Sequence, residues 1–131
     1  MLIDANIFLE VLLNQTHAIS AFTLLERIGK GDGEAFVSDF TIDSVLLVMH
    51  NHKASSSEMN NFLLQIINSK GMTVYSVTLQ DRIGALRHIE KYGLDYEDAL
   101  VLQSAISTKS GQIVSFDTDF DSVKGIERVE P

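Results

Sequence analysis

The chain has 131 residues, a length that fits one compact domain and leaves little room for a second independent core. Hydrophobic residues make up 45% of the sequence and charged residues 21%, a balance that argues against a disordered or fibrous chain. Eighteen acidic and ten basic residues give a formal net charge of −8, which opposes non-specific binding to nucleic acid. We therefore expect a single domain over residues 1–131, in which bound cations would have to neutralise the acids if the substrate is a nucleic acid.

Cysteine and membrane segments are both missing from the sequence. The absence of cysteine excludes disulfides, zinc–thiolate sites and thiol nucleophiles. The longest uninterrupted apolar run, Val45 to Met49, is far shorter than the roughly 20 residues that a membrane-spanning helix needs. Because no basic segment precedes an apolar one at the N-terminus, we expect neither membrane insertion nor secretion, and a cytoplasmic location by default.

Short runs rich in Val, Ile and Phe are typical of buried strands. Such runs occur at Met1–Ile3, Ala35–Val37, Met72–Val77 and Gln112–Phe116. Between them, apolar residues recur at the three- and four-residue spacing of helices. We expect helices over Asn6–Leu13, from Ala18 to the turn residues at Gly29–Gly33, from Thr41 as a cap, from Ser57 or a neighbour, over Leu79–Lys91, and from Asp95.

Strands that alternate with helices indicate a parallel or mostly parallel sheet with helices on both faces. The predicted fold class is therefore α/β, arranged as a single-domain α/β/α sandwich. In such sheets, ligands bind outside the carboxyl ends of the strands, near the point where the strand order reverses. The residues that follow the strands are the first candidates for a functional site.

Three predicted strands are followed by an aspartate, namely Asp4, Asp39 and Asp117. Asp98 lies in the first turn of the helix that begins near Asp95, so we expect it at the same rim of the sheet. Carboxylates that repel one another destabilise a fold unless protons or cations hold them together. Oxygen ligands without His or Cys favour Mg²⁺ or Mn²⁺, so the pattern suggests metal-assisted phosphate chemistry.

Each acid also has a purely structural explanation. Asp4 is placed to cap the helix that follows it, and Asp117 is placed to make a turn. Asp95 and Asp98 have the spacing of an acidic capping box. These local roles do not predict that four acids meet at one rim, which is why the metal interpretation is favoured.

Three segments contain these acids in short motifs: LIDAN at Leu2–Asn6, YGLDYEDA at Tyr92–Ala99 and IVSFDTDF at Ile113–Phe120. Together they resemble the signatures of the PIN-domain ribonucleases. Leu2–Asn6 (LIDAN) resembles the opening signature, in which a strand delivers an Asp followed two residues later by Asn or Thr. Tyr92–Ala99 (YGLDYEDA) is similar to the second signature, an Asp-Ala pair that opens a helix. Ile113–Phe120 (IVSFDTDF) resembles the third, in which Thr or Ser, any residue and Asp or Asn precede a loop with Phe. The segments stand in the family's order and span nearly the whole chain.

This resemblance implies a PIN-like fold and an endoribonuclease that cuts RNA with Mg²⁺ or Mn²⁺, often as the toxin of a toxin–antitoxin pair. The implied metal ligands are Asp4, Asp98 and Asp117. The residues implied to support or orient them are Asn6, Ser38, Ser115 and Asp119, of which Asp119 is either an accessory acid or a loop residue only. The implied partners are an RNA substrate and an antitoxin protein.

One position departs from the family pattern. PIN nucleases usually have a Glu in the helix after the second strand, and the equivalent position here falls near Ser44. Asp43 is one residue away and Asp39 lies earlier on the helix, so either is a candidate replacement, although each residue of a helix is turned by about 100° from the last. We favour Asp39 as the fourth catalytic acid because it lies at a strand end. The missing Glu weakens the expectation of a second metal ion.

Other side chains carry weaker predictions. The four histidines are scattered over different predicted elements, which argues against general-base catalysis by histidine and places His17, His50, His52 and His88 at the surface. Tyr92 and Tyr96 are either packing residues or stacking partners of a base. The large apolar side chains around Phe22 and Phe62 exceed what one small core requires, and PIN relatives commonly dimerise, so we predict a homodimer.

Other classes of protein fit parts of this pattern. A receiver-like phosphoacceptor domain would need adjacent acids after the first strand, where Asp4 is followed by Ala5. A haloacid-dehalogenase-like phosphatase would carry the Asp117–Asp119 motif at the start of its fold, whereas here the motif lies near the end. The remaining alternative is a non-enzymatic PIN-like module, for RNA binding or protein assembly, that has lost the Glu. Metal binding measured by calorimetry separates that alternative from a nuclease.

Overall fold

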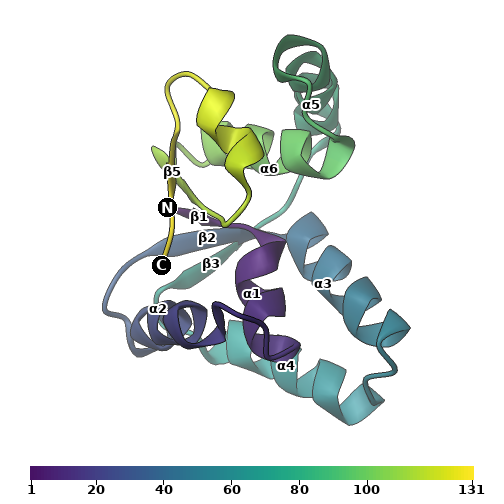
Figure 1. The fold of residues 1–131 in the computed structure, drawn as a ribbon, viewed down its shortest axis with the longest axis vertical. Coiled ribbons are helices and arrows are strands. Elements are labelled where there is room, and N and C mark those ends of the chain that lie inside the picture. The colour runs from purple at the N-terminus through teal and green to yellow at the C-terminus, as the bar shows by residue number, and fades with distance from the viewer.

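The computed structural model describes residues 1–131 and contains one sheet of five parallel strands. The strands are Leu2–Ile3 (β1), Ala35–Ser38 (β2), Met72–Tyr75 (β3), Gln112–Val114 (β4) and Glu127–Val129 (β5). They lie in the order β3-β2-β1-β4-β5, so β1 is the central strand (Figure 1). The four predicted strands are confirmed, and β5 is additional: its three residues, Glu-Arg-Val, contain no apolar run that could have indicated it.

Helices lie on both faces of this sheet. They are Ala5–Leu12 (α1), Ala18–Lys30 (α2), Asp39–Asn51 (α3), Ser56–Asn68 (α4), Leu79–Tyr92 (α5) and Tyr96–Ser107 (α6), with a short 3₁₀ helix at Thr118–Ser122 (η1). Figure 1 shows α1 to α4 on one side of the sheet and α5, α6 and η1 on the other. The predicted α/β/α sandwich with a parallel sheet is confirmed. None of its helices is both long enough and apolar enough to span a membrane.

Each face of the sheet has its own hydrophobic core. Leu2 and Ile3 of β1 are both fully buried but belong to different cores, because successive side chains of a strand point to opposite faces. Ile113 and Val114 of β4 divide in the same way. Burial on both faces explains why these strands read as continuous apolar runs in the sequence.

The strand order reverses at β1. The chain passes from β1 to β2 and β3 on one side, and then crosses to β4 and β5 on the other side. Leu2 pairs with Ile113 and Ile3 with Val114, so the residues that follow these two strands emerge side by side. Open parallel sheets form ligand sites at such a reversal, which places the candidate site here.

Two predicted helix boundaries were wrong. The N-cap of α3 is Ser38 and not Thr41: the Ser38 hydroxyl oxygen accepts a hydrogen bond from the Thr41 backbone N–H at 2.9 Å. The second helix, α2, runs through Gly29 and ends at Gly31, whose φ of 88° is easily adopted only by glycine. A glycine inside the pattern had suggested an earlier end, but a single glycine is tolerated in a helix that packs well.

The large apolar side chains thought to exceed the needs of the core have different positions. Phe62 is 3% exposed and packs edge-to-face against Phe8, with ring centroids 5.6 Å apart, so it is part of the core. Phe22 is 54% exposed on α2. A further apolar stripe is exposed on α5, where the residues share one face of the helix: Leu79, Ile83 and Leu86.

Candidate functional site

The candidate site is built where β1 and β4 end and where α6 begins. Asp4 follows β1 directly, and its backbone N–H donates to the Val114 carbonyl oxygen at 3.1 Å. Asp117 follows β4 and precedes η1, while Asp98 lies in the first turn of α6. These three acids therefore come from three different segments of the chain.

Asp4 is 4% exposed and is held by hydrogen bonds from three residues. Its Oδ1 accepts from the Ala5 backbone N–H at 2.6 Å, and its Oδ2 accepts from Asn6 Nδ2 at 2.9 Å and from Ser115 Oγ at 2.7 Å. Burial raises the pKa of Asp4 to about 6, although the hydrogen bonds from Ser115 and Ala5 act in the opposite direction. Asp4 thus caps α1, as its position suggested, and also joins β1 to the loop after β4.

Asp98 is 9% exposed and is not the cap of its helix. The N-cap of α6 is Asp95, whose Oδ1 accepts from the Asp98 backbone N–H at 2.8 Å. Burial raises the pKa of Asp98 to about 7, and repulsion from Asp95 and then Asp4 adds to the shift. A proton or a cation that neutralises this carboxylate would therefore stabilise the folded protein.

Asp98, Asp117 and Asp119 bring one carboxylate oxygen each to within 4.8 Å of one another. The turn into η1 makes this possible, because Asp117 Oδ1 accepts from the Asp119 backbone N–H at 2.9 Å. Figure 1 shows η1 beside α6, the helix that carries Asp98. Asp98 is buried, Asp117 half-buried and Asp119 exposed, so this acid cluster opens to solvent on the side of η1.

Asp4 lies outside this acid cluster but interacts with it electrostatically. Repulsion from Asp117 raises the pKa of Asp4, and repulsion from Asp4 raises that of Asp98. Ser115 connects them: its Oγ donates to Asp4 and accepts from the Asp117 backbone N–H at 2.9 Å. Asn6 completes the connection, with its Nδ2 donating to Ser115 Oγ at 2.8 Å.

The acids after β2 have other contacts. Asp39 Oδ1 accepts from the Phe40 backbone N–H at 2.8 Å and from the Val77 backbone N–H at 3.0 Å, so it ties α3 to the segment before α5. Asp43 is exposed on α3. Neither residue is a member of the acid cluster, which leaves the position of the missing Glu near Ser44 without a replacement there.

Two charged residues near the site were missed by the sequence analysis. Glu97 is exposed beside Asp98 and raises the pKa of Asp4 by repulsion. Arg128 on β5 has a side chain only 13% exposed, and its Nη1 donates to the Ser115 carbonyl oxygen at 3.1 Å. Its Nε also donates to Asp121 at 2.5 Å, which fixes η1. Because β5 itself was not predicted, no signal in the sequence pointed to Arg128.

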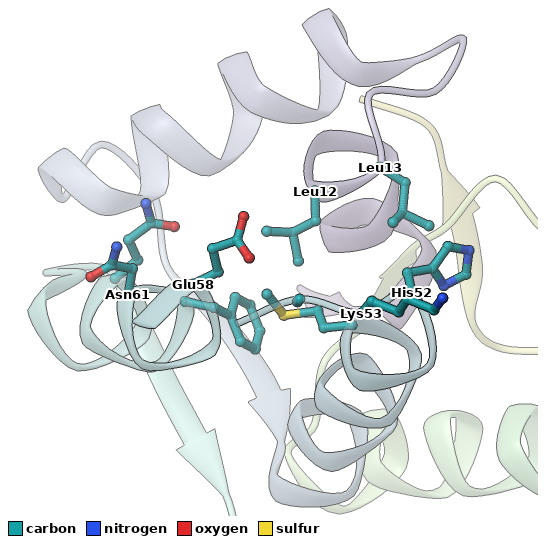
Figure 2. A pocket seen from close by; sticks show the side chains of 10 residues that line it. Leu12, Leu13, His52, Lys53, Glu58 and Asn61 are labelled. Atoms are coloured by element: carbon teal, nitrogen blue, oxygen red, sulfur yellow. The ribbon is translucent and has the colours of Figure 1, made fainter. Parts of the chain in front are cut away.

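A cavity of about 360 Å³ lies away from these acids, between α1, α3 and α4. Figure 2 shows Glu58 and Asn61 at one end of it and His52 and Lys53 at the other. None of the acids of the candidate site lines this cavity. The shape of the surface therefore gives no reason to move the candidate site from the strand ends.

The donor set of the acid cluster defines the ion that it would suit. All three donors are carboxylate oxygens, and neither histidine nor cysteine is among them. Hard cations such as Mg²⁺ and Mn²⁺ prefer such oxygens, and a positive ion would relieve the repulsion among the carboxylates. The residues therefore fit a divalent cation of this class.

Comparison with known proteins identifies the family. A family model described as the PIN domain matches residues 1–126, so this chain belongs to the PIN-domain family. The match agrees with the three sequence segments that resemble the family's signatures. Among curated protein sequences, none matches this chain.

Solved structures share the fold at low sequence identity. VapC20 of Mycobacterium tuberculosis, described as a toxin that cleaves the sarcin–ricin loop, is 13% identical with a TM-score of 0.78, over 99% of this chain and 98% of that one. A toxin–antitoxin complex from Klebsiella pneumoniae is 17% identical with a TM-score of 0.71, over 95% and 93%. VapBC2 from Rickettsia felis, bound to a DNA fragment from its promoter, is 17% identical with a TM-score of 0.69, over 98% and 96%. At these identities the likeness establishes the fold.

Proposed function

We propose that this chain is a metal-dependent endoribonuclease of the toxin type, which cleaves phosphodiester bonds of RNA. The observation that carries the proposal is the acid cluster, in which Asp98, Asp117 and Asp119 bring carboxylate oxygens within 4.8 Å of one another. Membership of the PIN-domain family supports it, as does the fold shared with VapC20, which is described as a toxin that cleaves the sarcin–ricin loop.

The proposed cofactor is Mg²⁺ or Mn²⁺. The proposed ligands are Asp4, Asp98 and Asp117, with Asp119 as an accessory acid. Burial supports this assignment, with repulsion among the acids as a smaller contribution, because both raise the pKa of Asp4 and of Asp98 and so disfavour these charges without a counter-ion. When bound, the cation would supply an activated water and neutralise charge on the phosphodiester.

The chain's own residues position the acids. Ser115 and Asn6 hold Asp4 by hydrogen bonds, and Ser115 also accepts from the Asp117 backbone N–H, so one hydroxyl group links the Asp4 carboxylate to the main chain of Asp117. Ser38 holds the start of α3, and Asp39 joins it to the segment before α5. Because no side chain of the acid cluster is a nucleophile of the serine or cysteine kind, hydrolysis by water is the chemistry that these residues suit.

Mutation of the acids tests the proposal. Asp98→Asn and Asp4→Asn should abolish Mn²⁺-dependent cleavage of single-stranded RNA, because a neutral amide is a poorer ligand for the ion. Asp32→Asn, which changes an exposed acid that pairs with Arg27 away from the acid cluster, is the matched control and should leave cleavage unchanged. A wild-type protein that cleaves no RNA in Mn²⁺, or an Asp98→Asn variant as active as the wild type, would contradict the proposal.

The second candidate is a PIN-like module that binds RNA or assembles with protein without cleaving. The observation in its favour is the missing Glu near Ser44, since Asp39 is engaged in backbone hydrogen bonds and Asp43 lies outside the acid cluster. Titration calorimetry with Mn²⁺ separates the two candidates. Binding that is lost in Asp98→Asn favours the nuclease, and no binding by the wild type favours the module.

We further propose an antitoxin partner and a cytoplasmic location, where such a protein would meet RNA. The support is that two similar folds come from toxin–antitoxin complexes, those of Klebsiella pneumoniae and Rickettsia felis. A small DNA-binding protein encoded beside this gene would be the candidate. Co-expression should yield a complex that no longer cleaves RNA, and two proteins that purify separately would contradict the pairing.

We also propose a homodimer. Leu79, Ile83 and Leu86 form an apolar stripe on α5 that is more than half exposed, and a second copy of the chain would remove it from water. Light scattering at micromolar concentration should give the mass of a dimer, and Ile83→Glu should give that of a monomer. A monomeric wild type would contradict the proposal.

A further inference from the structure

His17 and Phe116 form an aromatic stack beside the candidate site. Their ring centroids lie 4.4 Å apart and the ring planes differ by only 17°. His17 is exposed and Phe116 half-buried, so Phe116 supports one face of the imidazole and the exposed surface of His17 is on the outer side of the stack. An aromatic ring with one supported face and one open face is the arrangement on which proteins stack nucleobases.

The imidazole of His17 has no role in the helix that it precedes. His17 is the N-cap residue of α2, yet its side chain makes no capping hydrogen bond. Its backbone is held on both sides: the N–H donates to Glu10 Oε2 at 2.6 Å, and the carbonyl oxygen accepts from the Ala21 N–H at 3.1 Å. The backbone at the base of the ring is therefore held, and the stack on Phe116 is the contact that orients the imidazole.

Phe116 connects this stack to the acids. It stands between Ser115 and Asp117 in the chain, and its backbone N–H donates to Asn6 Oδ1 at 3.3 Å. The same Asn6 donates to Asp4 from its Nδ2. The inner side of Phe116 packs against the core beneath α1 to α4, which makes the support rigid. The stack thus begins one residue away from an acid of the acid cluster.

We propose that the open face of His17 is the stacking site for one nucleobase of the RNA substrate, next to the phosphate that would lie at the acid cluster. The inference rests on the proposed nuclease function and names the part of the substrate that this surface takes. Stacking does not depend on charge, which matters for a chain with a net charge of −8 that repels phosphate over most of its surface. Every base has a flat face, so the site would bind without strong sequence preference.

The other aromatic pair near the acids has a different geometry. Phe40 and Tyr96 meet edge-to-face, with an angle of 83° between planes and centroids 6.0 Å apart. Tyr96, which the sequence analysis weighed as a base-stacking residue, therefore has its ring engaged with Phe40 and lacks a parallel support. His17 is the better candidate, although its distance from Asp117 in the sequence concealed it.

Steady-state kinetics with Mn²⁺ and a short single-stranded RNA test the proposal. His17→Ala should raise KM about tenfold, the effect of losing one stacked base, and leave kcat nearly unchanged, because stacking binds substrate and transition state alike. His17→Phe keeps a flat ring and should retain the wild-type KM. His50→Ala, which changes an exposed histidine on α3, is the matched control and should have no effect.

An abasic substrate series identifies the base. At one nucleotide position, removal of the base should raise the wild-type KM by about the same factor as His17→Ala. The same abasic substrate should not raise the KM of the His17→Ala variant any further. If the effects of base removal and of His17→Ala on KM are additive at every position, the proposal is overturned. It is also overturned if His17→Ala lowers the melting temperature and leaves KM unchanged, because His17 would then only shield Phe116 from water.

RNA binding in Ca²⁺, followed by fluorescence anisotropy, keeps this inference separate from the nuclease proposal. Binding that weakens in His17→Ala but is retained in His17→Phe supports the stacking site, even if the wild type cleaves nothing. Cleavage that depends on Asp98, with a KM and an RNA affinity that His17→Ala leaves unchanged, overturns the stacking site and leaves the nuclease proposal intact. A wild type that neither binds nor cleaves RNA overturns both.

Discussion

Ser115 donates a hydrogen bond from Oγ to Asp4 Oδ2 at 2.7 Å, and the two residues are 111 positions apart in the sequence. Both side chains are buried, and the bond joins the loops that follow β1 and β4 at the reversal of strand order. The same Oγ accepts from the Asp117 backbone N–H. One hydroxyl group therefore connects two of the proposed metal ligands.

Loss of this hydroxyl should change both stability and pH dependence. Ser115→Ala removes a hydrogen bond that lowers the pKa of Asp4, so that pKa should rise above its value of about 6. Leaving buried groups without their partner should lower the free energy of unfolding by about 1–3 kcal/mol. The acid limb of the pH–rate profile for Mn²⁺-dependent cleavage should move to higher pH. An unmoved profile would contradict the coupling, and Ser44→Ala on α3 is the control.

Asp98→Ala should remove activity without lowering stability. The N-cap of α6 is Asp95, so this substitution leaves the cap in place and removes a carboxylate whose pKa is raised by burial and then by repulsion from its neighbours. Thermal melts in EDTA at about pH 8 should give a melting temperature equal to or above that of the wild type. At about pH 5, Asp98 is largely protonated and no longer repels Asp95. Under that condition Asp95→Ala should lower the free energy of unfolding by about 1 kcal/mol, the usual contribution of an N-cap. A lower melting temperature for Asp98→Ala with activity retained would assign Asp98 a structural role only.

The metal-free protein should lose stability as pH rises from about 4 to about 7. The pKa values of Asp4 and Asp98 are raised from 3.8 to about 6 and about 7, so in this range the folded protein binds more protons than the unfolded chain. The stability that these two groups contribute is fully present below their pKa of 3.8 in the unfolded chain. It is lost as the pH rises through their pKa values of about 6 and about 7 in the folded protein. Melts in EDTA at several pH values check this, and saturating Mn²⁺ should reverse the trend. A melting temperature that rises over this range in EDTA would contradict it.

Asp81 contributes with the opposite sign and at lower pH. Burial favours its neutral form, but hydrogen bonds led by those from Ser107 and Thr78 outweigh this and lower the pKa of Asp81 to about 2. Its stabilising contribution is present above the unfolded value and is lost as pH falls toward about 2. The metal-free protein should therefore be most stable in mildly acidic solution.

Arg128 should act on the site through η1. Its side chain contacts Asp121 of η1 and the Ser115 carbonyl oxygen, so Arg128→Gln should loosen the turn that carries Asp119. We expect weaker Mn²⁺ binding by calorimetry and a lower melting temperature. Arg87→Gln changes an exposed arginine on α5 and serves as the control. Unchanged Mn²⁺ affinity in Arg128→Gln would confine Arg128 to a role in stability.

The sequence predicted those parts of the site that depend on local order. Apolar runs in the sequence indicate buried parallel strands, and the residues that follow such strands lie at the carboxyl edge of the sheet. Asp4 and Asp117 could be placed in this way. The contacts of Asp39 and His17 could not be predicted. Asp39 binds a backbone N–H that is 38 residues away, and His17 stacks on a ring from the far end of the chain. Such pairs arise from the packing of whole elements and leave no periodic signal.

The pairing of β1 with β4 also determines when the site can form. Leu2 pairs with Ile113, and closing the long loop between them costs chain entropy before the contacts between the two strands offset that cost. A chain still short of Gln112 already contains Asp4 and Asp98, but it has neither Ser115 to hold the first nor Asp117 to complete the cluster. During synthesis, the acids would therefore come together only after nearly the whole chain has emerged, so the proposed nuclease would stay inert until its last strands had paired.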